Sequence, residues 1–200
     1  MISLTINKIA FEIGPLMIRW YAVLIVGGAA IGTWLAYKEA PYRHLTGDDL
    51  IDFVIWAVPS GLVGARFYYV IFNWSYYSKY PNEIIALWNG GGAIYGSLIA
   101  GTIVLFIFSY YRMVNPMDIL DVAVPAVFLG QSIGRWGNFV NKEAYGKKVE
   151  NLDWLPSFIQ NQMYIDGSYR NPTFLFESFG TLIGFILAII FQKQKKSILR

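Results

Sequence analysis

The sequence contains no cysteine, and among its 200 residues there is a single histidine, His44. The absence of cysteine excludes disulfides, thiolate metal sites and a cysteine nucleophile belonging to the chain itself. With only one histidine, metal-site or triad chemistry based on imidazole groups is not expected either. We therefore predict a protein that uses neither a metal ion nor another cofactor.

Charged residues are also scarce. Only 14% of the residues are Asp, Glu, Lys or Arg, whereas 56% are hydrophobic and 18% are aromatic. A soluble domain of this length normally carries about a quarter charged residues, so the composition predicts an integral membrane protein. The net charge of +3 is spread along the chain, with no basic run dense enough to indicate nucleic-acid binding.

Five apolar segments are long enough to cross the hydrocarbon core of a bilayer as helices. They cover residues 18–37, 50–72, 93–111, 118–140 and 173–191. We predict an all-α, polytopic membrane helix bundle forming a single domain. The segment 73–92 is expected to form an arm lying on the membrane, and the hydrophilic segment 141–172 a small extracytoplasmic head.

The distribution of basic residues predicts the orientation of this bundle. Lys and Arg are denser in residues 38–49, in residues 112–117 and in the C-terminal tail than in the N-terminal lead, the arm and the head. Because the denser side is normally cytoplasmic, we expect the N-terminus outside and the C-terminus inside. This topology places four groups near the outer membrane boundary, namely Arg66, Tyr95, Arg135 and Glu177.

The most informative stretch is residues 130–146, GQSIGRWGNFVNKEAYG. If it is helical, its polar side chains share one face, namely Gln131, Arg135, Asn138 and Lys142. Glycines at 130, 134 and 137 allow close approach of a neighbouring helix. An arginine is costly in lipid, so Arg135 should meet an anion in a bundle interior or wet cavity. Pairing with an acidic side chain elsewhere in the bundle is the structural alternative.

Residues 134–146, GRWGNFVNKEAYG, resemble the most characteristic motif of the bacterial prolipoprotein diacylglyceryl transferases, G-R-x-G-N-F-[IV]-N-x-E-x-x-G. Further segments resemble the family along the whole chain: Arg19-Trp20-Tyr21, Gly64-Ala65-Arg66, 91–96 with Tyr95, 118–125 with Asp121, and 171–177 with Glu177. The family pattern continues into two further spans with another arginine. Because the sequence stops at Arg200, we expect either an incomplete product or helices supplied by another chain.

The resemblance implies an enzyme of the bacterial cytoplasmic (inner) membrane. The implied reaction moves the diacylglyceryl group of phosphatidylglycerol to the thiol of the lipobox cysteine of a prolipoprotein. It forms a thioether, releases glycerol phosphate and begins lipoprotein maturation. The partners would be phosphatidylglycerol, the prolipoprotein and the lipid bilayer, and the thiol nucleophile would come from the substrate, consistent with a chain that lacks cysteine.

The resemblance also assigns roles to individual residues. Arg135 is expected to stabilise the departing phosphate, with Arg66 as a second cation or an ion-pair partner. Asn138 and Asn141 would orient phosphate or glycerol oxygens, although capping of the helix end is the alternative for Asn141.

The base that deprotonates the thiol remains open between Tyr95, Glu143 and Glu177, because a phenol is a poor base unless a nearby cation ionises it. Glu177 and Asp121 are also assigned to the phosphatidylglycerol site. Tyr21 completes this set, with packing in an aromatic belt as its alternative.

A second class of function is compatible with these charges. Arg66 and Arg135 could line the anion pathway of a small transporter or channel subunit that assembles with another chain. No inverted repeat is visible in the sequence, and the polar groups are expected at one membrane boundary rather than at mid-membrane.

Overall fold

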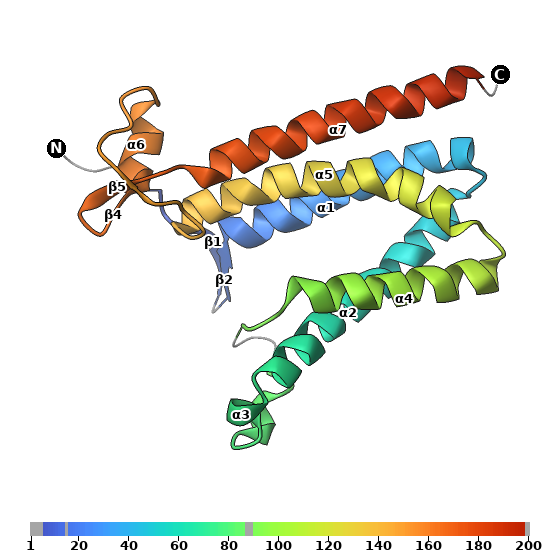
Figure 1. Cartoon of the computed structure of the whole chain (residues 1–200), viewed down its shortest axis with the longest axis horizontal. Coiled ribbons are helices and arrows are strands. Elements are labelled where there is room, and N and C mark those ends of the chain that lie inside the picture. The colour runs from blue at the N-terminus through green and yellow to red at the C-terminus, as the bar shows by residue number, and fades with distance from the viewer. Residues whose placement is uncertain (1–5, 15, 87–89, 199–200) are drawn as a thin grey trace. The chain divides into compact units, whose positions relative to one another are not determined.

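The structure is a computed structural model that describes residues 6–14, 16–86 and 90–198. Five of its helices are long and apolar enough to cross a membrane, as the all-α polytopic class requires. They are α1 Trp20–Glu39, α2 Gly47–Phe72, α4 Ile94–Arg112, α5 Pro116–Asn141 and α7 Thr173–Ile198 (Figure 1). The predicted fold class is confirmed, with two small sheets added to it.

The chain divides into two compact units. The first, called here the site unit, comprises residues 1–36 and 123–200, and the second, the arm unit, comprises residues 37–122. The single-domain organisation expected from the sequence therefore remains a prediction.

In the site unit, α1, α5 and α7 lie side by side (Figure 1). Glycines bring α1 against α5, since a Cβ added at Gly28 would lie 3.4 Å from the Gly130 Cα, and one added at Gly32 would lie 2.9 Å from the Ala126 carbonyl oxygen. The expected close helix approach is thus found at Gly130. At Gly134 an added Cβ would meet nothing within 4 Å, so this glycine is not needed for packing.

Serine hydroxyls join α5 to α7. Ser132 Oγ donates to the Ser178 carbonyl and Ser178 Oγ donates to the Ser132 carbonyl, each at 2.9 Å. The indole Nε1 of Trp136 donates to Ser178 Oγ at 3.1 Å. Both serines are buried, and this reciprocal arrangement satisfies their polar groups, as a buried hydroxyl requires.

The head forms at the end of α5 and the start of α7 and consists here of residues 142–172. Its elements are β3 Lys148–Val149, α6 Ser157–Met163, β4 Tyr164–Ile165 and β5 Ser168–Arg170, and its antiparallel sheet has the order β3-β5-β4. One hydrophobic core joins it to the helices, made of Phe139, Val140, Leu152, Leu155, Ile159, Met163, Phe174 and Leu175. The head is therefore packed onto the spans rather than attached by a linker.

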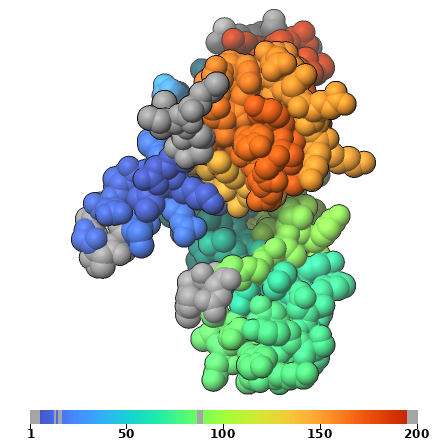
Figure 2. Space-filling model, turned by 90° about the vertical axis from the view of Figure 1, so that its left-hand side faces the viewer, coloured from blue at the N-terminus to red at the C-terminus, as the bar shows by residue number. Residues whose placement is uncertain are grey.

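The N-terminal lead is a β-hairpin, which the sequence did not predict. It pairs β1 Ile9–Ile13 with β2 Leu16–Arg19, and it lies beside the head in the view of Figure 2. The buried Gln162 ties the lead to the head. Its Nε2 donates to the Phe139 and Val140 carbonyls, and its Oε1 accepts the Ile6 N–H at 3.1 Å.

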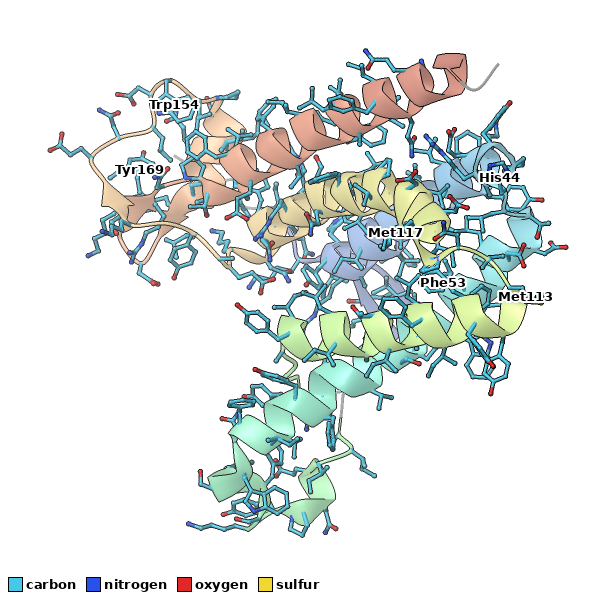
Figure 3. The ribbon with its side chains drawn as sticks, turned by 45° about the vertical axis from the view of Figure 1, so that its right-hand side comes forward. His44, Phe53, Met113, Met117, Trp154 and Tyr169 are labelled. Carbon is cyan, nitrogen blue, oxygen red and sulfur yellow. The ribbon has the colours of Figure 1, made fainter. Side chains whose placement is uncertain are left out.

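The arm unit is built on the pair α2 and α4. Their backbones touch, since a Cβ added at Gly64 would lie 2.5 Å from the Gly96 carbonyl oxygen, and Phe53 packs edge-on to Phe108 with ring centroids 5.6 Å apart (Figure 3). Thr46 and Asp49 form a capping box at the start of α2. Short helices complete the unit: η1 Ala40–Arg43, α3 Trp74–Tyr77 and η2 Pro81–Glu83.

Candidate active site

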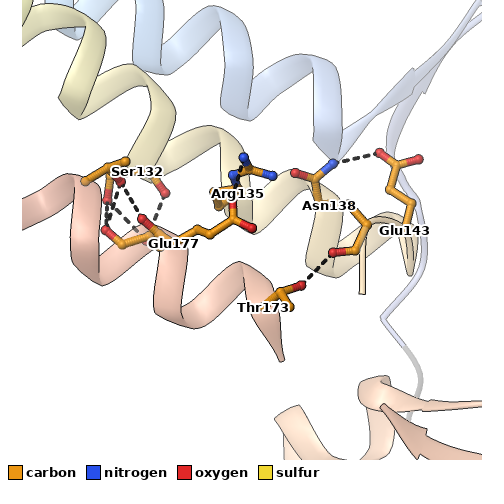
Figure 4. A network of polar contacts seen from close by, with 9 residues as sticks. Ser132, Arg135, Asn138, Glu143, Thr173 and Glu177 are labelled. Carbon is orange, nitrogen blue, oxygen red and sulfur yellow. Dashed lines mark hydrogen bonds and ion pairs between the residues drawn. The ribbon is translucent and has the colours of Figure 1, made fainter. Parts of the chain in front are cut away.

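The last turns of α5 face the first turns of α7, where Arg135 meets Glu177, and Asn138 meets Glu143 at the end of α5 (Figure 4). Arg135 Nη2 forms an ion pair with Glu177 Oε2, and the two side chains are 38% and 45% exposed. The acidic partner considered as the structural alternative for Arg135 is thus present. Of the five guanidinium N–H donors, this pair occupies only part, so the remaining donors can bind a phosphate.

Beyond Arg135 in the sequence, the Glu143 carboxylate accepts hydrogen bonds from two side-chain amides. Glu143 Oε1 accepts hydrogen bonds from Asn138 Nδ2 at 3.1 Å and from Asn141 Nδ2 at 3.3 Å. Asn141 Oδ1 is buried without a hydrogen-bond partner. Because an unsatisfied buried acceptor is costly, this oxygen marks a place that a donor group of a ligand could fill.

The turn after α5 corrects one prediction. Lys142 does not continue the polar face of the helix, because α5 ends at Asn141 and Lys142 has a φ of 56°. Its N–H and that of Glu143 bond to the carbonyls of Phe139 and Asn138, at 3.2 and 3.0 Å. This tight turn reverses the chain, and so it brings Glu143 back onto the two asparagines.

The loop that carries Glu143 is fastened to the start of α7. Gly146 N–H donates to the Asn171 carbonyl and Asn171 N–H donates to the Lys147 carbonyl, both at 2.9 Å. The Thr173 hydroxyl donates to the Ala144 carbonyl at 2.7 Å. These bonds hold the Glu143 carboxylate and the Glu177 helix in one rigid local frame.

Tyr21 joins the same region from α1. A Cβ added at Gly137 would lie 2.7 Å from Tyr21 Cδ2, so the ring lies directly on the α5 backbone between Arg135 and Asn141. Close packing on α5 rather than on lipid alone explains why a glycine is needed at position 137. Assignment of Tyr21 to a lipid site stays a prediction.

Arg66 has a different environment, inside the arm unit. Its side chain is buried, and its guanidinium donates four hydrogen bonds of 2.5–2.9 Å to backbone carbonyls. The acceptors are the carbonyls of Glu83, Ile84, Gly90 and Gly91. Its carbon Cζ lies 5.2 Å from the ring centroid of Tyr77. Arg66 thus donates to backbone carbonyls, and its expected role as a second cation or an ion-pair partner at the lipid site stays a prediction.

The two other expected site residues also belong to the arm unit. Tyr95 lies in the first turn of α4, is 65% exposed and packs on Tyr68, with ring centroids 6.2 Å apart. Asp121 Oδ2 lies 3.4 Å from Nη1 of the buried Arg43. It precedes Arg135 by nearly four turns of α5, about 21 Å of helical rise. The structure therefore brings together Tyr21, Arg135, Asn138, Asn141, Glu143 and Glu177 within the site unit, and the assignment of Asp121 to the lipid site stays a prediction.

Sequence reasoning missed two polar residues near this site, Gln162 and Arg170. Both lie in the head, Gln162 on the seven-residue helix α6 and Arg170 on a strand of three residues, and elements this short leave no periodic pattern to read. A buried polar side chain such as Gln162 becomes recognisable only when its carbonyl partners are known. In the part of the chain that the structure describes, no cluster of His, Asp and Glu could hold a metal ion.

Chemically, the site combines a partly exposed guanidinium with a carboxylate fixed by two amides. A guanidinium presents a planar fork of donors that matches phosphate oxygens, and a carboxylate within reach of a thiol can accept its proton. The arrangement suits displacement of a phosphate leaving group from carbon by an external nucleophile.

A family model described as prolipoprotein diacylglyceryl transferase matches residues 8–199. The chain is 67% identical over 197 residues to the phosphatidylglycerol–prolipoprotein diacylglyceryl transferase of Lactococcus lactis subsp. lactis, a match that covers 98% of this chain and 76% of that protein. The enzymes of the same name from Streptococcus agalactiae and Streptococcus equi subsp. zooepidemicus are 55% and 56% identical over 193 and 194 residues, covering 96% and 97% of this chain and 75% of each relative. With the motif residues gathered at the end of α5, these matches show that the chain belongs to the prolipoprotein diacylglyceryl transferase family.

Proposed function

We propose that this chain transfers the diacylglyceryl group of phosphatidylglycerol to the lipobox cysteine thiol of prolipoproteins. The thiol sulfur forms a bond to the glyceryl carbon that carries the phosphate, while the carbon–oxygen bond breaks and glycerol phosphate departs. The thiol proton passes to a base of the enzyme. Family membership and the names of the relatives support the reaction. The structural observation that carries it is that Arg135 has N–H donors still available, in the same site as the Glu143 carboxylate, which two amides hold in place.

Arg135 is the group proposed to hold the departing phosphate. An ion pair as exposed as Arg135–Glu177 contributes about 0–1 kcal/mol, so a phosphate that accepts two charge-assisted hydrogen bonds can join or displace the carboxylate at little cost. Glu177 would then keep the guanidinium aimed at the site while it is empty. Asn138 and Asn141 would contact the remaining oxygens of the headgroup.

Glu143 is the base that the geometry favours. Both hydrogen bonds from the asparagine amides go to its Oε1, which leaves Oε2 to accept the thiol proton. A cysteine thiol has an ordinary pKa near 8.5, and the nearby cation Arg135 would favour the substrate's thiolate. Tyr95 and Glu177 remain the alternative bases. The anion-transport alternative gains no support from the family match.

The decisive experiment uses the purified chain in detergent with a lipobox peptide and phosphatidylglycerol. Thioether formation should increase the peptide mass by one diacylglyceryl group and release one glycerol phosphate. A peptide with Ser in place of the cysteine, and phosphatidylcholine in place of phosphatidylglycerol, are the controls. Anion flux from liposomes without any peptide modification would overturn the proposal.

For the topology, we propose a multi-pass protein of the bacterial cytoplasmic membrane with the N-terminus and head outside and the C-terminus inside. Because the chain has no cysteine, single cysteines report on their own positions. Ser157→Cys in the head should react with an impermeant thiol reagent in intact cells, whereas Gln194→Cys at the end of α7 should react only after permeabilisation. The reverse pattern would overturn this orientation.

A further inference from the structure

Two basic side chains stand opposite each other on the head sheet. In the antiparallel pair β3–β5, Lys148 is the register partner of Arg170, and Val149 is the partner of Tyr169. Val149 and Tyr169 pack against the hydrophobic core, so the alternation of a strand places Lys148 and Arg170 on the other face of the sheet. Like charges directly opposite each other destabilise a sheet, and the pairing therefore calls for a counterion.

The head does not supply that counterion. Among the described residues, the ion pairs join other side chains and none reaches Lys148 or Arg170. Arg170 Nε is buried without a hydrogen-bond partner. The guanidinium carbon lies 5.3 Å from the ring centroid of Tyr145, so an aromatic face holds the planar fork while its donors remain unfilled. Such a fork matches the oxygens of a phosphate.

The pair also lies close to the ends of two spans. Arg170 is three residues before the start of α7 at Thr173, and the bond between Gly146 N–H and the Asn171 carbonyl joins its strand to the loop after α5. From the same head, Trp154, labelled in Figure 3, stacks on Phe176 of α7 with ring centroids 6.2 Å apart and is 61% exposed. Exposed Trp at the end of a span is typical of the headgroup layer.

We infer that Lys148, Arg170 and Tyr145 form a binding site for the phosphate headgroup of an anionic phospholipid. A lipid is favoured over free phosphate because Arg170 lies next to the ends of α5 and α7, and the ends of spans are where headgroup phosphates are concentrated. Bound there, the lipid would neutralise the opposed cations. It would also be held beside the loop that carries Glu143, which raises the local concentration of phosphatidylglycerol near the reaction. This supply role rests on the proposed function, whereas the binding site itself does not.

The test measures the acetylation rates of individual lysines by mass spectrometry in the intact chain, reconstituted in nanodiscs. Relative to phosphatidylcholine discs, phosphatidylglycerol discs should slow acetylation of Lys148 about fivefold, as for a cation held at an anionic lipid surface. Lys147, the adjacent residue, is the internal control and should slow less. Glycerol phosphate added to phosphatidylcholine discs should protect neither lysine.

Two variants link the protection to the site. Arg170→Gln should abolish the difference between Lys148 and Lys147, while the matched charge change Arg112→Gln in the arm unit should leave it intact. If Arg170→Gln lowers the helical circular dichroism signal, Tyr145→Leu, which removes the aromatic platform without changing charge, is tested instead and should reduce the protection.

Equal slowing of both lysines would reduce the effect to the general potential of an anionic membrane and overturn the site. Protection by glycerol phosphate alone would overturn the assignment to a lipid. Acetylation does not depend on catalysis, so selective protection of Lys148 in a chain that modifies no peptide would uphold the site while contradicting the transferase function.

Discussion

Arg66 in the arm unit and Arg135 in the site unit are both arginines of apolar helices, yet their surroundings differ. Arg66 is 5% exposed and gives four hydrogen bonds to backbone carbonyls. Arg135 has a side chain that is 38% exposed and pairs with one carboxylate. The comparison teaches that the role of an arginine in a membrane segment can be judged from how many of its guanidinium N–H groups already donate hydrogen bonds. A guanidinium most of whose N–H groups have acceptors in the protein, such as that of Arg66, holds the backbone in place. A guanidinium with N–H groups still available, such as that of Arg135, can bind a ligand.

The largest expected effect is the loss of stability when Arg66 is replaced. Arg66→Gln would leave several carbonyls of the arm without donors, and we expect it to lower the free energy of unfolding of the arm unit by about 3 kcal/mol. Arg66→Lys should recover only part of this loss, because one ammonium cannot reach four carbonyls. Unfolding by dodecyl sulfate, followed by circular dichroism, measures it.

Arg112 offers a matched control for Arg66 in the same unit. It is an arginine that is 44% exposed and pairs with Asp52, so Arg112→Gln should cost less than about 1 kcal/mol. Equal destabilisation by the two substitutions would contradict the view that burial and carbonyl bonding set Arg66 apart.

Arg135 should affect the rate of thioether formation rather than the stability of the fold. Arg135→Gln is expected to lower kcat on the order of a hundredfold or more, as does loss of one preorganised donor in other enzymes. Arg135→Lys should lose nearly as much, since it keeps the charge but not the two-pronged geometry. Thioether formation is the measurement. If Lys restored most of the rate, Arg135 would be acting as a simple charge and the proposed phosphate fork would be wrong.

A smaller effect is expected from the partner of Arg135. Glu177→Gln should change the free energy of unfolding by less than about 1 kcal/mol, because the ion pair is partly exposed. The KM for phosphatidylglycerol should fall, since phosphate no longer competes with a carboxylate for the guanidinium. A loss in kcat as large as that of Arg135→Gln would instead make Glu177 the base and displace Glu143 from that role.

The smallest effect concerns the arm that Arg66 holds. Tyr76 donates a hydrogen bond to the Glu83 carboxylate at 2.8 Å, and this bond raises the pKa of the Tyr76 phenol above 10.0. A raised pKa means that the stabilisation is complete below pH 10 and is lost as the pH rises through the folded-state value. Ultraviolet difference titration of wild type against Tyr76→Phe should show one phenol ionising above pH 10. An ionisation at or below pH 10 would contradict the bond.

The spans were predictable from the sequence because bilayer thickness dictates their length. Arg135 and Glu143 were recognisable from their motif, but their contacts were not. The pairing of Arg135 with Glu177 depends on the contact of α5 with α7 through Ser132 and Ser178. No local sequence pattern predicts that contact. The predicted span ends at residue 140 and α5 ends at Asn141, but the placement of Lys142 on the polar face of this helix was wrong. Lys142 and Ala144 adopt positive φ, 56° and 52°, where only glycine, asparagine or aspartate would have signalled a left-handed turn.

The hydrogen-bond partners of Arg66 also could not be predicted from the sequence. The glycines at 90 and 91 lie near the end of the segment expected to form an arm, and their φ values of 77° and 85° are ones that glycine adopts readily. That their carbonyls would turn toward an arginine on α2 follows from the tertiary packing of the arm. Residue type indicated that Arg66 needed partners in an apolar helix, but only the structure identifies them.

The bond between Gln162 and Ile6 has a consequence for the order in which the protein is made. The two residues are separated by 156 positions, so Ile6 can meet Gln162 only after α1, α2, α4 and α5 have been synthesised. Closing so long a loop is slow compared with local helix formation. Docking of the N-terminal hairpin on Gln162 therefore follows the formation of these helices and cannot guide their assembly.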